Sequence, residues 1–313
     1  MFEPKQDACT AAEIAKFLGT ELHGRDCAVY QGCSLDQMQD NSVLWIGKRA
    51  RDQGYDLSQL DAYVEMLVIL WDQCPARPNC AYVLSTQPRL DFVRVLNEFL
   101  VYREKPGIHP TAIVEKGAVV GKDALIGAHS YIGPKVRIGD NCRIYQNVSI
   151  LGDVTIGPCC VVKSSAVIGS EGFSFVTGDG GLEHFPQTGR IVIGANVWIG
   201  SGSTIERAAI NATTIEDEVK IDDLVQIGHN TTIGRQSQIT AGVVVCGRSH
   251  VGRGVWIAPN ATINNGVRVG DDAYVGLGAV VLKDVEPGTV VVGNPAKFLK
   301  QRKDLDAGDD RVL

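Results

Sequence analysis

The sequence predicts a mainly β protein, in which a parallel β-helix of hexapeptide repeats follows a small α/β domain. An aliphatic residue recurs at every sixth position from Ile108 to Ile168 and again from Ile215 to Val281. Glycine often follows the aliphatic residue, and the chain contains 35 glycines, which suits frequent tight turns. A period of six fits neither an amphipathic helix nor an alternating strand, so it indicates a solenoid of short strands.

Three hexapeptides would make one coil of about 18 residues, and successive coils would stack about 4.8 Å apart. Residues one coil apart in sequence would then lie directly above one another. We expect the aliphatic residues of the repeat to face the interior: Ile108, Val114, Val120, Ile126, Ile132, Ile138, Ile144, Ile150, Ile156, Val162, Ile168, Ile193, Ile199, Ile205 and the equivalent positions from Ile215 to Val281.

Two insertions interrupt the repeat. Residues 170–190 are rich in glycine and are expected to form a loop outside the coil. Residues 206–214 make a shorter offset. Because long loops in an otherwise strict repeat usually carry binding function, the longer insertion is expected to contribute to a site.

Residues 1–104 lack the repeat and are expected to form the α/β domain. Thr10 and Glu13 have the spacing of a capping box and Gly19 can end a helix, so a short helix is expected between them. Residues 64–71 are expected to be a buried strand or helix core. An amphipathic helix is predicted after Pro88, with a face formed by Leu90, Val93, Leu96 and Leu100.

Residues 103–107 are charged and then break regular structure, so they are expected to link the first domain to the β-helix of residues 105–293. Residues 294–313 are expected to be a short charged tail, frayed near residues 307–310.

The composition excludes several classes of function. The net charge of −6 argues against nucleic-acid binding, and the longest apolar run, residues 66–71, is too short for a transmembrane segment. Residues 1–9 lack the apolar core of a signal peptide. The nine cysteines include no CxxC pair, which argues against a disulfide framework or a metal site. We therefore expect a cytoplasmic protein with reduced thiols.

Three stretches resemble the UDP-3-O-acylglucosamine N-acyltransferases of lipid A synthesis (LpxD). They are residues 10–24, the sequence IGSEGFSF at 168–175 with FPQTGRIVIG at 185–194, and IDDLVQIGHN at 221–230. Together with the domain order, the resemblance covers nearly the whole chain. It implies a left-handed β-helix, a nucleotide-sugar-binding first domain, and a homotrimer with active sites in grooves between subunits. It also implies acyl transfer from a thioester co-substrate, with no permanently bound cofactor.

The resemblance assigns the catalytic residues. His229, in QIGHN, would be the general base, and the backbone N–H of Gly247, one coil further on, would stabilise the oxyanion. The alternative for His229 is a surface histidine in a polar turn, and the alternative for Gly247 is an ordinary turn glycine. Asn230 would either orient His229 or satisfy its own turn.

The expected substrate-binding residues lie in two regions. In the long insertion, Phe173 and Phe175 would either wall the nucleotide or sugar or anchor the loop on its own coil, and His184 would contact substrate. In the first domain, Trp45 would either stack on a nucleobase or lie in the core. Lys48, with its basic neighbours, would either hold a diphosphate or simply be solvated.

The chain departs from the family at three places. A second family histidine falls on Gly266, and an asparagine and a tyrosine of the nucleotide site fall on Lys48 and Arg51. The family's C-terminal helical segment, which engages acyl carrier protein, is not found. The ending GNPAK at residues 293–297 instead resembles coenzyme-A-dependent sugar acetyltransferases.

These departures favour an N-acyltransferase that uses acyl-CoA, or alternatively acyl carrier protein, to acylate a nucleotide-linked amino sugar for surface glycan or lipid synthesis. The lipid A pathway enzyme that acylates UDP-3-O-(3-hydroxyacyl)glucosamine from acyl carrier protein is the first alternative. A non-catalytic binding solenoid is the second. A metal-dependent solenoid enzyme would need three converging histidines, and the six histidines include no close pair in the repeat.

Overall fold

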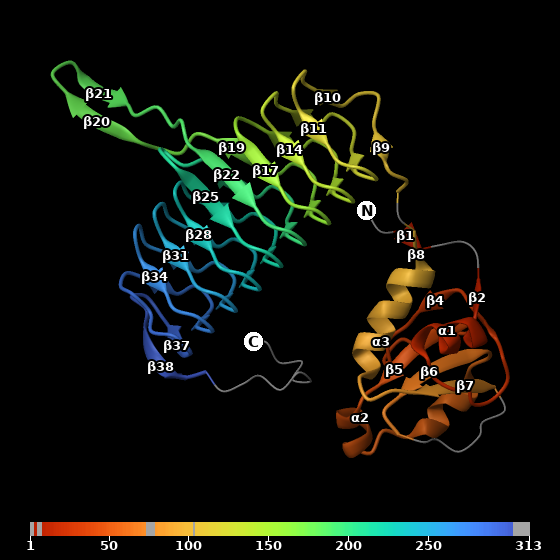
Figure 1. Cartoon of the computed structure of the whole chain (residues 1–313). Coiled ribbons are helices and arrows are strands. Elements are labelled where there is room, and N and C mark those ends of the chain that lie inside the picture. Colours follow the sequence, from red (N-terminus) through yellow and green to blue (C-terminus); the bar gives the residue numbers. More distant parts are fainter. Residues whose placement is uncertain (1–2, 5–7, 73–78, 103, 303–313) are drawn as a thin grey trace. The chain divides into compact units, whose positions relative to one another are not determined.

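The computed structural model describes residues 3–4, 8–72, 79–102 and 104–302. The chain divides into two compact units, Met1–Glu104 and Lys105–Leu313 (Figure 1). None of the described helices is long and apolar enough to cross a membrane.

The first unit contains a parallel sheet with the strand order β4-β5-β6-β7. Its strands are β4 (Gln31–Gly32), β5 (Ser42–Ile46), β6 (Met66–Leu70) and β7 (Cys80–Leu84). The helices are α1 (Ala11–Leu18), α2 (Lys48–Asp52), the 3-10 helix η1 (Leu57–Ala62), α3 (Pro88–Val95) and the π-helical turn η2 (Leu96–Leu100). Two short antiparallel pairs join β1 (Glu3–Pro4) to β8 (Val101–Tyr102) and β2 (Cys9–Thr10) to β3 (Ala28–Val29).

The helix predicted near the N-terminus is α1. The Thr10 hydroxyl accepts from the Glu13 N–H at 3.1 Å, the Glu13 carboxylate accepts from the Thr10 N–H at 2.9 Å, and Gly19 ends the helix with φ of 67°. The buried segment expected at residues 64–71 is the strand β6, all of whose residues are buried.

The helix predicted after Pro88 forms, but only the second half of its predicted face is buried. Leu90 and Val93 are exposed, whereas Val95 and Leu100 are buried, and Leu96 packs beside them. The buried residues keep the spacing of three and four, and Phe92 and Phe99 complete their face. The prediction was therefore wrong for Leu90 and Val93 and correct for Leu96 and Leu100.

The second unit is a solenoid of three parallel sheets (Figure 1). The first sheet contains β9 (Gly107–Ile108), β12 (Leu125–Ile126), β15 (Arg143–Ile144), β18 (Val161–Val162), β23 (Trp198–Ile199), β26 (Lys220–Ile221), β29 (Gln238–Ile239), β32 (Trp256–Ile257), β35 (Tyr274–Val275), β37 (Thr289–Val292) and the antiparallel β38 (Lys297–Gln301). The second contains β10 (Ile113–Val114), β13 (Tyr131–Ile132), β16 (Ser149–Ile150), β19 (Val167–Ser170), β24 (Thr204–Glu206), β27 (Gln226–Ile227), β30 (Val244–Val245), β33 (Thr262–Ile263) and β36 (Val280–Val281). The third contains β11 (Val119–Val120), β14 (Arg137–Ile138), β17 (Val154–Ile156), β22 (Arg190–Ile193), β25 (Ala212–Ile215), β28 (Thr232–Ile233), β31 (His250–Val251) and β34 (Arg268–Val269).

The strand register confirms the hexapeptide solenoid. Ile126 pairs with Ile144, and Ile227 pairs with Val245, so one coil takes 18 residues. The long insertion lengthens one coil, so that Ile168 pairs with Ile205. The shorter offset lengthens the next, so that Ile205 pairs with Ile227. The left hand of the coil stays a prediction.

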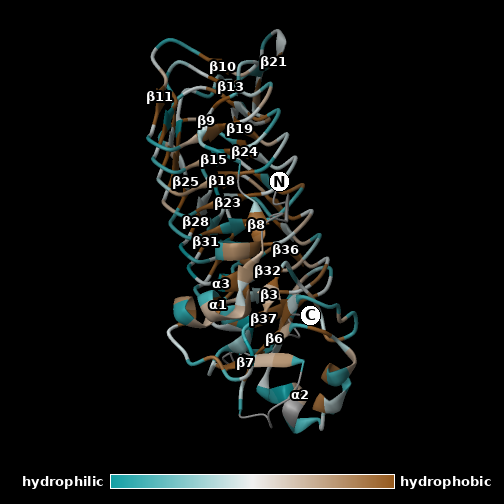
Figure 2. Cartoon of the chain, turned by 90° about the vertical axis from the view of Figure 1, so that its right-hand side faces the viewer, coloured by the Kyte–Doolittle hydropathy of each residue, from teal (hydrophilic) through white to brown (hydrophobic). Residues whose placement is uncertain are grey.

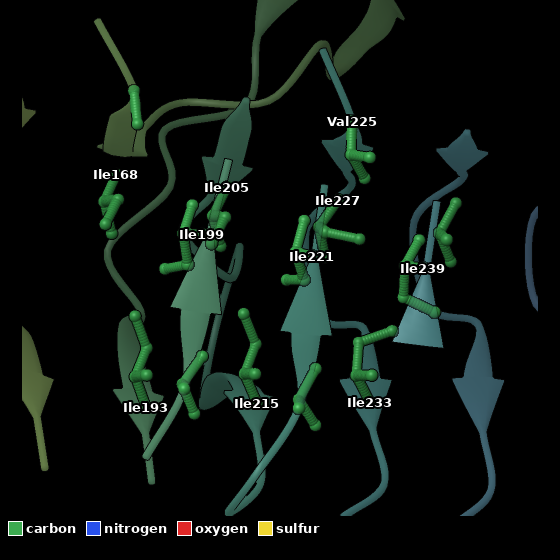
Figure 3. Packing of buried hydrophobic residues seen from close by; sticks show 14 of the residues in the cluster. Ile168, Ile193, Ile199, Ile205, Ile215, Ile221, Val225, Ile227, Ile233 and Ile239 are labelled. Carbon is green, nitrogen blue, oxygen red and sulfur yellow. The ribbon is translucent and has the colours of Figure 1, made fainter. Parts of the chain in front are cut away.

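The aliphatic residues of the repeat form the core, as Figure 3 shows for the rows around Ile205 and Ile227. Figure 2 shows hydrophobic and hydrophilic residues recurring along the successive coils. Ile108 is an exception: it is 52% exposed, because β9 is the end strand of its sheet. A second buried row, two positions before each core residue, was not predicted; it includes Val136, Cys142 and Val148.

The long insertion contains an antiparallel hairpin, β20 (Phe175–Gly178) and β21 (Gly181–His184), which projects from the stacked coils (Figure 1). The solenoid ends with β38, which pairs with β37. The side chain of Arg302 then donates to the carbonyls of Gly254, Asp272 and Ala273 at 3.0–3.1 Å. Residues 297–301 of the expected tail thus form an exposed strand, while residues 307–310 lie outside the described residues.

Candidate active site

His229 lies at the corner between β27 and β28, two residues after the buried Ile227. Its ring is half-buried, and its backbone N–H donates to Glu206 Oε2 at 3.2 Å. The same carboxylate accepts from the Gln226 side chain at 3.2 Å. The coil before His229 therefore holds the main chain of the corner in place.

Both the oxygen and the nitrogen of the Asn230 side-chain amide form hydrogen bonds in this corner. Its Nδ2 donates to the carbonyl of Ile210 at 2.7 Å, and its Oδ1 accepts from the N–H of Ala209 at 3.0 Å. These two backbone partners distinguish the amide oxygen from the nitrogen. The same Oδ1 lies 3.1 Å from His229 Nδ1. Because an amide oxygen only accepts, Nδ1 carries the proton, and in the neutral ring the lone pair is then on Nε2.

The partners of Asn230 come from the short offset in the repeat. Ala209 and Ile210 lie between β24 and β25, and the hydroxyl of Thr213 in β25 accepts from the Asn230 N–H at 2.8 Å. Asn230 has φ of 60°, a left-handed conformation that asparagine tolerates. The added residues of the offset thus supply two of the groups that fix the amide.

Gly247 lies against the imidazole of His229. A Cβ atom on Gly247 would lie 2.8 Å from His229 Nε2, so only glycine leaves room for the ring. At the same place in some hexapeptides on another corner, the N–H donates to a carboxylate of the next coil, as Lys122 does to Asp140 and Arg253 to Asp271. The Gly247 N–H has no such partner among the residues that the structure describes.

Cys246 precedes Gly247, but its burial and a nearby negative charge disfavour a thiolate there. Burial raises the pKa of its thiol, and the negative charge of Glu206 raises it further. At neutral pH the thiol therefore stays protonated. The lone pair that can accept a proton at this corner belongs to His229.

The residues expected from the long insertion gather on the hairpin. The rings of Phe173 and Phe175 lie 5.1 Å apart, and Phe175 lies 5.4 Å from the ring of His184. His184 Nε2 is 3.3 Å from Glu171, whose other oxygen is 3.8 Å from Arg207. Phe173 is 89% exposed, so it is not anchored on its own coil. Within the described part of the chain, no hydrogen bond or ring contact joins these side chains to His229.

The residues expected from the first unit lie at the carboxyl end of the strand β5. Trp45, on β5, is half-buried and packs against the core of that unit, whereas Lys48 is exposed at the start of α2. Trp71 was missed: it follows β6, is 40% exposed, and donates its N–H to Ile46 at 3.2 Å. Its place directly after a buried parallel strand was a usable signal, because ligands bind at the carboxyl ends of such strands. The side chain of Arg51 lies outside the described residues.

A cavity of about 490 Å³ lies at the base of the hairpin. Its lining includes Arg207, Glu171, Asp153, Lys135 and Gln187. Since Ile205 pairs with Ile227, Arg207 occupies the same corner as His229, one coil earlier. The cavity and the imidazole therefore lie along one corner of the solenoid.

No group of three His, Cys, Asp or Glu side chains within the described ranges is placed to hold a metal ion. The site consists of the His229 imidazole, the unpaired N–H of Gly247 and a polar cavity.

Comparisons with known proteins match successive parts of the solenoid. Residues 108–172 match the GMPPB C-terminal domain, and residues 190–222 match the hexapeptide repeat of succinyl-transferase. Residues 212–247 and 248–283 match the bacterial transferase hexapeptide (six repeats).

Curated relatives point to one family. A UDP-3-O-acylglucosamine N-acyltransferase of Oleidesulfovibrio alaskensis is 48% identical over 130 residues, 42% of this chain and 38% of the relative. One of Caulobacter sp. is 32% identical over 151 residues, 48% of this chain and 44% of the relative. The chain is similar to UDP-3-O-acylglucosamine N-acyltransferases. The resemblance to this family is thus confirmed, although the two matches span less than half of this chain and less than half the length of these relatives.

Solved structures of related acyltransferases share the solenoid. The UDP-N-acetylglucosamine acyltransferase of Campylobacter jejuni matches with a TM-score of 0.56 and 27% identity, over 62% of this chain and 75% of that one. The enzyme of Francisella novicida matches with a TM-score of 0.56 and 28% identity, over 62% and 69%.

Proposed function

We propose that this protein is an N-acyltransferase that moves an acyl group from a thioester donor to the amino group of UDP-3-O-acylglucosamine. The observation that carries the proposal is the His229 lone pair, fixed by Asn230 and set beside the unpaired N–H of Gly247. Of the two acceptors considered from the sequence, the names of the relatives favour this one over another nucleotide-linked amino sugar.

The reaction needs one base and one oxyanion donor. As the amine attacks the thioester carbonyl, His229 Nε2 takes the proton that the nitrogen must lose. The Gly247 N–H donates to the oxygen that becomes negative. The tetrahedral intermediate then collapses, the C–S bond breaks, and the thiolate takes the proton back from Nε2. Asn230 Oδ1 holds the Nδ1–H throughout and stabilises the imidazolium that forms.

The cavity beside Arg207 is the proposed place of the acceptor sugar. It presents the carboxylates of Asp153 and Glu171 together with the cationic side chains of Arg207 and Lys135. Hydroxyl groups both donate and accept, so this mixture suits a sugar better than a simple anion. From there the amine needs to cross about one coil spacing, roughly 4.8 Å, to reach the corner of His229.

The other expected contacts remain proposals. Trp45 or the more exposed Trp71 would stack on the nucleobase, and Lys48 would hold the diphosphate. Phe173 and Phe175 would cover substrate on a neighbouring subunit of a homotrimer in the cytoplasm. Acyl-CoA and acyl carrier protein both remain candidate donors.

The test is product detection. The purified protein is incubated with UDP-3-O-acylglucosamine or with other UDP- and dTDP-linked amino sugars, and with acyl-CoA or acyl carrier protein. Mass spectrometry should show an acyl group on the amine of UDP-3-O-acylglucosamine. If the sugar raises the melting temperature but no donor yields product, the protein is a binding solenoid and the proposal is wrong.

A further inference from the structure

Cys142 and Cys160 are stacked in the core of the solenoid. They are 0% and 1% exposed and hold the same inward position in successive coils, because Arg143 and Val161, which follow them directly, are paired. The Arg143 N–H donates to the Cys160 carbonyl at 2.7 Å, which fixes the spacing of the two main chains. The other buried members of this row are not cysteines: Ala124, Val197, Val219, Ser237, Val255 and Ala273.

The two thiols interact with each other. Cys142 Sγ donates to the Gly157 carbonyl at 3.1 Å, so it leans toward the turn that carries Cys160. Cys160 Sγ in turn donates to the Gly194 carbonyl of the next coil at 3.1 Å. A hydrogen bond with the Cys160 side chain lowers the pKa of the Cys142 thiol, and the same bond, together with burial, raises the pKa of the Cys160 thiol. Cys142 therefore loses its proton more readily and is the first of the two to react.

The stacking of the coils suits a disulfide bond between these two residues. Successive coils lie roughly 4.8 Å apart, and disulfides join Cα atoms that are about 4.4–6.8 Å apart. The neighbouring Cys159 is exposed and has no cysteine above or below it, because Asn141 and Asn196 hold its position in the adjoining coils with the same left-handed backbone. The stacked pair is thus distinct from its reachable neighbour.

We infer that Cys142 and Cys160 form a reversible disulfide when the protein is exposed to hydrogen peroxide, and that this bond cross-links two coils of the solenoid. The Cys142 sulfur attacks one peroxide oxygen, the O–O bond breaks, and a sulfenic acid and a water molecule result. The Cys160 sulfur then attacks the Cys142 sulfur, and the second oxygen leaves as water. The two thiols are oxidised by two electrons in all, and the peroxide is reduced to water.

The N-terminal end of the solenoid gives the oxidant a route to this pair. Ile108, Ile113 and Val119, in the first coil, are about half exposed, so this coil buries less apolar surface than the later ones. Each coil of a solenoid contacts only its neighbours, and local opening therefore begins at an end. Cys142 ends the second coil from this end, so a local opening of two coils exposes it.

The disulfide would close the coil that carries Gly152 and Asp153, two residues of the cavity at the base of the hairpin. A cross-link restricts the unfolded chain more than the folded one, so the oxidised protein should be the more stable form. Opening that begins at the N-terminal end would then stop before it reaches the cavity. The cross-link is independent of the proposed acyl transfer, which uses no thiol of the protein.

The test treats the reduced protein with hydrogen peroxide, blocks the remaining thiols with N-ethylmaleimide in denaturant and digests the product with trypsin without reduction. Cleavage after arginine and lysine separates Cys142, in residues 138–143, from Cys160, in residues 144–163. Mass spectrometry should show these two peptides joined by a disulfide, and the melting temperature should lie about 5–10 °C above that of the reduced protein. Dithiothreitol should reverse both changes.

Three serine variants identify the sulfur atoms. Cys142→Ser and Cys160→Ser should lose both the joined peptides and the rise in melting temperature, whereas Cys159→Ser, the exposed matched control, should keep them. If Cys159→Ser removes the link, the bond belongs to Cys159 and the inference is wrong. It also fails on the wild type alone if peroxide only adds oxygen to the cysteines, or if the link forms without raising the melting temperature.

Discussion

At Asn230, four contacts converge on one residue. Its amide oxygen receives one backbone N–H and the imidazole Nδ1–H, its amide nitrogen serves a backbone carbonyl, and its main-chain N–H reaches Thr213. Such an amide has one orientation. It therefore determines both the tautomer and the direction of the His229 ring, and two variants separate these roles.

Asn230→Ala should lower kcat by about 10²-fold with little change in KM, because the imidazole loses its fixed position. The matched control is Asn147→Ala, since Asn147 also has a left-handed backbone, with φ of 58°. Both variants carry the same backbone cost, so only Asn230→Ala should lose activity in steady-state assays.

Asn230→Asp tests the electrostatic part. A carboxylate beside Nδ1 favours the protonated ring, so the acid limb of the pH–rate profile should move to higher pH. An unmoved acid limb would mean that Asn230 only satisfies its turn.

At Gly247, the absence of a side chain is the relevant feature. Gly247→Ala should displace the imidazole, since the new methyl group would lie 2.8 Å from Nε2, and we expect kcat/KM to fall by about 10²-fold. Gly180→Ala, at a position with no heavy atom within 4 Å, is the control. Equal activity of both variants would place the His229 ring elsewhere.

At the scale of the element, each short strand contributes one inward side chain to a continuous row. Ile221→Ala should lower the free energy of unfolding by about 2–5 kcal/mol, because a fully buried side chain leaves a cavity. Gln238→Ala, at an outward position in the next strand of the same sheet, should change it by less than about 0.5 kcal/mol. Urea denaturation measures both, and similar values for the two would contradict the assigned register.

A charge pair also joins one coil to the second coil beyond it. Lys163 Nζ bonds the Asp223 carboxylate at 2.7 Å, and this bond, with the Ser201 N–H, holds the pKa of Asp223 below its usual range. A carboxyl whose pKa is lowered on folding stabilises the protein above its unfolded pKa, about 3.9, and loses that effect as pH falls through the folded value.

Asp223→Asn should therefore be less stable than wild type at pH 7, and the difference should vanish in acid. Because the pair is partly exposed, the effect is expected to stay below about 1 kcal/mol. Thermal unfolding across a pH series measures it, with the exposed Asp179→Asn as control. A difference that persists below about pH 2 would show that the ion pair is not its source.

The elements differ in how far the sequence predicts them. The rows of Ile and Val follow from local periodicity, which survives both insertions because each coil resumes the same register. The terminal strand β38 has no such period, since it pairs antiparallel with β37. The hairpin was expected only as a loop, because its exposed strands lack a buried face.

At the scale of the whole molecule, the site is harder to predict than the fold. His229 and Gly247 follow from the motif and the length of one coil. The hydrogen-bond partners of the Asn230 side chain cannot be predicted in this way. They lie in the offset, where the hexapeptide register does not specify which residues are neighbours. The sequence gives a weak indication that the Gly247 N–H is unpaired. The residue one coil after Gly247 is Asn265, whereas the residues one coil after Lys122 and Arg253 are aspartates that accept their N–H groups.

The most direct measurement is the rate of acyl transfer to UDP-3-O-acylglucosamine by His229→Ala, with the exposed His129→Ala as control. Removing the general base should lower kcat by about 10²–10⁴-fold, while circular dichroism and the melting temperature stay unchanged. A folded His229→Ala protein that transfers acyl groups at the wild-type rate would contradict the assignment of His229 as the base.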